Sequence, residues 1–137
     1  MATIIGEKPL QTEVDAYFEL VEQYMHGDCA YLAAAMHHLY KLPLGMLIVF
    51  HRSKHNVETA HLSHAWAVAA EGYVDIQGLQ TLDQVSYFKV DASKWEILCP
   101  VSLAELEEFL TQKLPADNPD VIKATIVLEK YKHWIFR

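Results

Sequence analysis

Cys29 is the residue whose type and position most clearly allow chemistry. It follows Gly27 and Asp28 and opens an alanine-rich stretch with almost no charge, which predicts a largely buried helix. Cysteine attacks as a thiolate, and the positive end of a helix with its unpaired N–H groups stabilises that form. The same N–H groups can hold the oxyanion that forms when a thiolate attacks a carbonyl. The position therefore favours a nucleophile.

Two other interpretations of Cys29 stay open. Free cysteine is among the most often buried residue types, so Cys29 could simply fill space in the core. Asp28 is the natural N-cap side chain, and its negative charge opposes a thiolate beside it. A redox role would require the sulfur of Cys99, the other cysteine, to be a neighbour.

His64 and Asp75 are the candidate partners of Cys29. His64 is the ionisable residue of an otherwise mostly apolar run from 63 to 70, and Asp75 lies between two apolar residues in the next run. A cysteine at a helix start, with a histidine and an acid on adjacent strands, fits the nucleophile, base and orienter of covalent catalysis.

The turn between these two runs decides whether Asp75 can orient His64. If residues 71 and 72 form a two-residue turn, Asp75 pairs with Val68, about 13 Å along the strand from His64. An earlier turn or a bulge would bring it closer. Otherwise Gln77, opposite Trp66 in that register, is one diagonal step from His64 and is the alternative orienter.

The order of these residues resembles the papain-like and transglutaminase-like cysteine enzymes. The resemblance rests on GDC at 27–29, HAWAVAAEGY at 64–73 and VDIQG at 74–78, and it covers about residues 23 to 78. The pattern is also similar to small bacterial and phage proteins of unknown function that share GDC, a histidine and DxxG. The resemblance implies a helix that starts at the nucleophilic cysteine and packs on a small antiparallel sheet.

The resemblance also implies roles. Cys29 would be the nucleophile, His64 the general base and acid, and Asp75 the orienter. Gln23, six residues before Cys29, matches the oxyanion-hole glutamine of papain-like peptidases, although a solvated helix face explains it equally well. Trp66 would shield the imidazole and line an acyl pocket, or pack in the core.

The implied activity is that of a hydrolase or acyltransferase on an amide or thioester, with a protein or peptide as substrate or partner and no cofactor. A non-catalytic binding or inhibitor module of the same fold is the alternative. No metal is expected, because the other histidines form no HExxH or Cys/His cluster with ligand spacing. They are His26, His37, His38, His51, His55, His61 and His133.

Composition narrows the class of protein further. The 137 residues suit one domain over 1–137, 52% of them are apolar, and no repeat or linker interrupts them. A net charge of -7 argues against nucleic acid and anionic membranes as partners. The apolar runs are too short to span a bilayer, and the first residues lack the pattern of a signal peptide, so a cytoplasmic protein is expected.

The elements that must position these residues predict an α+β domain. An amphipathic helix is expected from Thr12 to Met25, and a central helix from Cys29 until Pro43 ends it. Strands are expected at 44–51, 63–70, 73–78 and 95–98, with a polar loop at 52–62 and a short helix at 79–88. A capping box opens a helix at 102–113, and Asn118 with Pro119 opens the last one.

Overall fold

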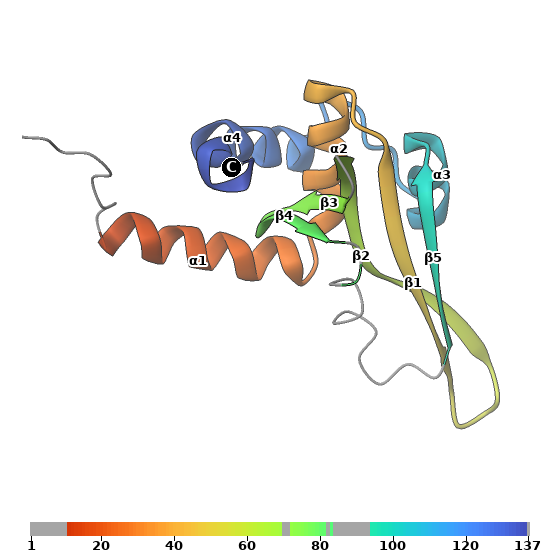
Figure 1. Ribbon diagram of the computed structural model, residues 1–137. Coiled ribbons are helices and arrows are strands. Elements are labelled where there is room, and N and C mark those ends of the chain that lie inside the picture. Colours follow the sequence, from red (N-terminus) through yellow and green to blue (C-terminus); the bar gives the residue numbers. More distant parts are fainter. Residues whose placement is uncertain (1–10, 70–71, 82, 84–93, 137) are drawn as a thin grey trace, which may run out of the picture.

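The computed structural model describes residues 11–69, 72–81, 83 and 94–136, and these form helices around one sheet (Figure 1). In chain order the elements are α1 (Gln11–Met25), α2 (Cys29–Tyr40), β1 (Leu44–Arg52), β2 (Glu58–Ala69), β3 (Gly72–Asp75), β4 (Gly78–Thr81), β5 (Lys94–Val101), α3 (Leu103–Leu110) and α4 (Pro119–Ile135). The predicted α+β class is therefore confirmed at the level of these elements.

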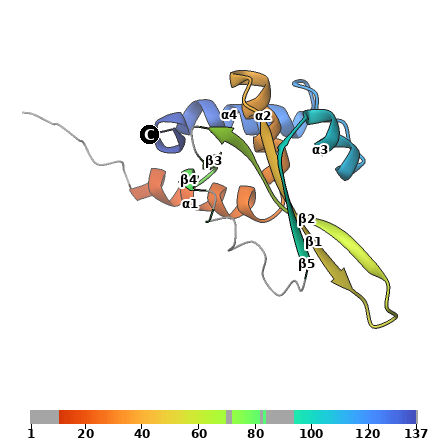
Figure 2. The same cartoon turned by 45° about the vertical axis from the view of Figure 1, so that its right-hand side comes forward.

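The five strands form a sheet in the order β4-β3-β2-β1-β5, and every neighbouring pair is antiparallel. β2 is the central strand, and β1 and β3 flank it. The long β1–β2 hairpin projects beyond the helices, as both views show (Figures 1 and 2). The central strand therefore has one end in the core and the other in solvent.

The central helix α2 packs against β2 on one side and α4 on the other. Its side chains Leu32, Ala34 and Met36 are buried, and they share one core with Ala65 and Ala67 of β2. Small alanines on both elements let the helix approach the strand closely. A helix beginning at Cys29 on a small antiparallel sheet was predicted, and it is present.

Local sequence signals fix the helix ends. Ser102 and Glu105 form the predicted capping box before α3, and the side chain of Asn118 caps α4 by accepting from Asp120 N and Val121 N. At the other end of α2, Lys41 adopts a left-handed conformation with φ 59° and stops the helix two residues before Pro43. These signals act within a few residues, which is why the sequence shows them.

Three predicted elements differ from the structure. The strand expected at 73–78 ends at Asp75 in β3, residues 76 and 77 form a turn, and Gly78 begins β4. The polar stretch 52–62 is expected as a loop, but it includes Glu58–Leu62 of β2. The pattern of a strand is not recognisable there, because the projecting hairpin is solvated on both faces and carries no apolar alternation. The short helix expected at 79–88 is wrong for Leu79–Thr81, which belong to β4 and pair with β3. Residues 82 and 84–88 of that prediction lie outside the described part.

None of the helices in the described part of the chain combines the length and the apolar character that crossing a membrane would need.

Candidate active site

Cys29 is the first residue of α2, and 6% of it is exposed. Asp28 precedes it as the N-cap, but its side chain makes no capping hydrogen bond to the helix. The carboxylate instead accepts a bond of 2.8 Å from Gln23 Nε2. The prediction that the Asp28 side chain caps the helix is therefore wrong, and its carboxylate does not bond the first N–H groups of α2.

His64 lies on β2 opposite Leu47 of β1, directly after an irregularity in the pairing: Leu47 pairs with His64, but the next residue, Ile48, pairs with Leu62. The imidazole is fully buried. Its Nε2 donates a hydrogen bond of 2.8 Å to Asp75 Oδ2. A buried polar ring needs such a partner, because without one it would lose its hydrogen bonds to water.

Asp75 is the last residue of β3 and is 3% exposed. Ala69 pairs with Gly72 and Ala67 with Val74, so Gly72 is a strand residue and the register differs by two positions from the one that a 71–72 turn would give. Continuing that register by one step brings Asp75 beside Trp66, one diagonal step from His64. The pairing with Val68 that a 71–72 turn would give does not occur, because Val68 pairs with Tyr73, and the alternative that brings Asp75 closer to His64 is the one observed.

The second carboxylate oxygen of Asp75 is also engaged, because Oδ1 accepts a bond of 2.8 Å from the backbone N–H of Gln77. Gln77, the alternative orienter, thus holds Asp75 through its main chain. Tyr17 of α1 fixes the same turn by donating a hydrogen bond to the carbonyl of Ile76. The two carboxylate oxygens of Asp75 are therefore bonded by His64 and by the Gln77 main chain.

The charge state of His64 links it to both partners. Burial lowers the pKa of His64, but hydrogen bonds to Asp75 and Cys29, together with the negative charges of these groups, raise it from 6.5 to about 9. The ring is therefore protonated at neutral pH. Cys29 and Asp75, 46 positions apart in the sequence, both act on one imidazole.

Aromatic rings enclose this imidazole. The ring centroids of Trp66 and Tyr73 lie 6.1 and 6.4 Å from that of His64, and the two aromatic rings are 5.3 Å apart. Trp66 is fully buried, so it shields the imidazole and packs in the core instead of lining an open pocket. The sequence analysis missed Tyr73, although its place two residues before Asp75 on a strand puts both on one face.

Gln23 is exposed on α1, and its amide is bonded to Asp28. It also borders a groove between α1 and α4. In this arrangement its amide bonds Asp28, the neighbour of Cys29. A direct role at the sulfur would require that bond to break.

The other thiol lies on an edge strand, and two of the remaining imidazoles bond backbone carbonyls. Cys99 is a free thiol exposed on the edge strand β5, while Cys29 is free and buried. His37 and His38 bond the carbonyls of Leu42 and Leu114. Within the described residues, no three histidine, cysteine or acidic side chains gather as metal ligands would.

The site predicts a pH-dependent stability. The folded pKa of His64, about 9, exceeds its unfolded value of 6.5, so the folded state holds a proton that the unfolded state releases. Protonation of His64 adds on the order of 3 kcal/mol to the free energy of unfolding below pH 6.5, and this stabilisation is lost as pH rises through about 9.

Two measurements check this prediction. Proton NMR of the imidazole resonances should show one histidine titrating near pH 9, absent in His64→Gln and retained in His55→Gln, a change at an exposed loop position. Urea unfolding should show the stability of the native chain falling between pH 7 and 10 more than that of His64→Gln. If His64 titrated with its ordinary pKa, the contacts of its ring with Asp75 and Cys29 would be contradicted.

No protein-family model matches this chain, and neither the curated proteins nor the solved structures contain a match.

Proposed function

We propose that this protein is a cysteine-dependent hydrolase or acyltransferase that acts on an amide or thioester through Cys29, His64 and Asp75. The observation that carries the proposal is the buried imidazole of His64, which is bonded to Asp75 at 2.8 Å and has its pKa raised by both Asp75 and Cys29. Since Nε2 is bonded to Asp75, Nδ1 is the ring nitrogen that remains for the thiol. This is the order of contacts that covalent catalysis by cysteine requires.

In the proposed reaction the His64 ring is already protonated, because its pKa is raised to about 9, and the thiol of Cys29 gives its proton to solvent. The imidazolium stabilises the thiolate that forms. The thiolate attacks the carbonyl carbon, and the imidazolium then protonates the departing amine or thiolate. An acyl group remains on Cys29 until water or an amine, deprotonated by His64, displaces it.

The oxyanion of this reaction would be held at the start of α2. The first N–H groups of a helix carry partial positive charge and point toward the residue at its beginning. The bond from Gln23 draws the Asp28 carboxylate into a separate contact, which supports this use of the amides. Gln23 acts here as a positioning residue for Asp28.

A non-catalytic module of the same architecture is the second candidate. The burial of the three side chains favours it, since none exposes more than 6% of its surface. A buried, satisfied polar network can specify a fold without reacting. This candidate requires Cys29 to be no more reactive than an ordinary buried thiol.

Alkylation by iodoacetamide distinguishes the two candidates. Cys99 is exposed and Cys29 buried, so access alone favours Cys99. If the thiolate pair forms, Cys29 should nevertheless react faster at pH 7, by about tenfold or more. Peptide mass spectrometry of the two sites gives the rates, and His64→Ala should remove the preference.

The pH profile of the native chain gives a second test that needs no variant. Below the pKa of an ordinary thiol, alkylation slows by about tenfold per pH unit. Between pH 8 and 6 the alkylation rate of Cys29 should therefore fall much less than that of Cys99. Equal labelling of both thiols, or the same slope for both, would favour the binding module.

A further inference from the structure

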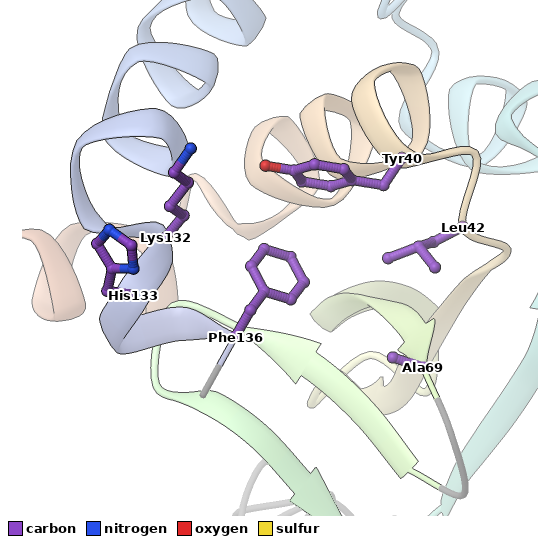
Figure 3. A pocket seen from close by; sticks show the side chains of 6 residues that line it. All are labelled: Tyr40, Leu42, Ala69, Lys132, His133 and Phe136. Atoms are coloured by element: carbon purple, nitrogen blue, oxygen red, sulfur yellow. The ribbon is translucent and has the colours of Figure 1, made fainter.

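A cavity of about 620 Å³ lies at the end of α2 opposite Cys29, between α2, β2 and the last turn of α4 (Figure 3). Its lining residues are Tyr40, Leu42, Ala69, Lys132, His133 and Phe136. Its size suits a small organic ligand. Cys29 and Tyr40 are the first and last residues of α2, about 17 Å apart along the helix axis, so this cavity is separate from the thiol.

The lining has a polar side and an apolar side. Lys132 and His133 project from α4 on one side, and the hydroxyl of Tyr40 points toward that side from across the cavity (Figure 3). The apolar side chains of Leu42 and Ala69 lie on the other side, and the ring of Phe136 lies between the two sides. The Phe136 and Tyr40 rings are 5.1 Å apart and form an edge contact.

The charge of the lining is unusual for this chain. None of the six residues is acidic, although the whole protein has a net charge of -7. Among the ion pairs of the described residues, none involves Lys132. A cation that faces a mostly apolar cavity and has no carboxylate partner among the described residues favours an anionic ligand with an apolar body.

We propose that this cavity binds a monocarboxylate with an unbranched apolar chain. The carboxylate would accept hydrogen bonds from Lys132 Nζ and the Tyr40 hydroxyl, and the chain would lie against Phe136, Leu42 and Ala69. A cationic ligand would instead be repelled by the charge of Lys132. The site is independent of the reaction at Cys29.

Decanoate is the probe, and decanol and decyltrimethylammonium are its neutral and cationic counterparts. Calorimetric titration of the full chain should show decanoate binding about tenfold more tightly than decanol, and the cation most weakly. Amide chemical shifts should move at residues 40–42 and 132–136 and stay constant around Cys29. Added salt should weaken the binding of decanoate but not that of decanol.

Lys132→Gln should reduce decanoate affinity about tenfold and leave that of decanol unchanged. Lys130→Gln is the matched control, because Lys130 lies two residues away and borders the groove between α1 and α4. Both side chains are exposed, so neither change threatens the fold. The proposal would be overturned if both variants lost decanoate affinity equally, or if decyltrimethylammonium bound as tightly as decanoate. It would also be overturned if the amide chemical shifts changed mainly on other surfaces, or if the chain formed a dimer that excluded decanoate from the cavity.

Discussion

Replacing Asp75 by Asn should cost about 3 kcal/mol of unfolding free energy at pH 7. The substitution keeps the size of the side chain but removes the negative charge that the His64 imidazolium faces at 2.8 Å. It also weakens the acceptor for the Gln77 N–H. The pKa of His64 should fall, because the bond to Asp75 is the largest of the contributions that raise it.

The pH dependence of this loss separates it from a general packing defect. At pH 10 the native chain has also lost the imidazolium, so the two proteins should differ much less than at pH 7. Asp117→Asn, the same change at an exposed position, should leave stability unaltered. Urea unfolding at both pH values gives the comparison, and an equal deficit at pH 7 and 10 would show that charge is not the cause.

The same variant tests the proposed reaction. Without the carboxylate, a smaller fraction of His64 should be protonated and able to stabilise a thiolate on Cys29, so alkylation of Cys29 by iodoacetamide should slow about tenfold or more at pH 7 while Cys99 is unaffected. Unchanged labelling of Cys29 in a folded Asp75→Asn protein would remove Asp75 from the proposed mechanism.

Replacing Gly45 by Ala is the second change with a large expected effect. Gly45 pairs with Trp66 across β1 and β2, and an added Cβ would lie 2.2 Å from Trp66 Nε1 and 2.4 Å from Cε2. The indole is fully buried and cannot swing into solvent. Strand and ring must therefore separate, at an expected cost of about 3 kcal/mol.

Gly27→Ala is the matched control, since a Cβ at that position meets no atom within 4 Å. Urea unfolding should show the loss for Gly45→Ala alone. Because the Trp66 ring packs against His64, with centroids 6.1 Å apart, Gly45→Ala should also lower the alkylation rate of Cys29 in the folded protein. If the two variants were equally stable, β1 would have shifted locally enough to accept the new methyl group without displacing Trp66.

Much of the fold could be predicted because its signals are local. The capping box at Ser102, the Asn118–Pro119 start of α4 and the alanine-rich α2 each depend on residues a few positions apart. The β1–β2 hairpin could not be delimited in this way. Its solvated residues carry no apolar alternation, and the pairing of β1 with β2 alone defines it.

The sequence by itself determined that Cys29 begins a helix and that His64 and Asp75 lie in two adjacent strand-forming runs. Only the tertiary structure decided that Asp75 reaches His64. Moving the turn by one residue moves Asp75 two positions along β2, since both strands shift, and this changes a distant pairing with Val68 into a place beside Trp66.

The same is true of the environment around the thiol. The sequence showed Asp28 as a charge next to Cys29, but only the packed α1 brings the Gln23 amide to that carboxylate. The raised pKa of His64 likewise depends on burial and on two partners from different elements. Residue type determined which groups can react or ionise, whereas tertiary contacts decided which groups meet, because register and burial are set by the whole core.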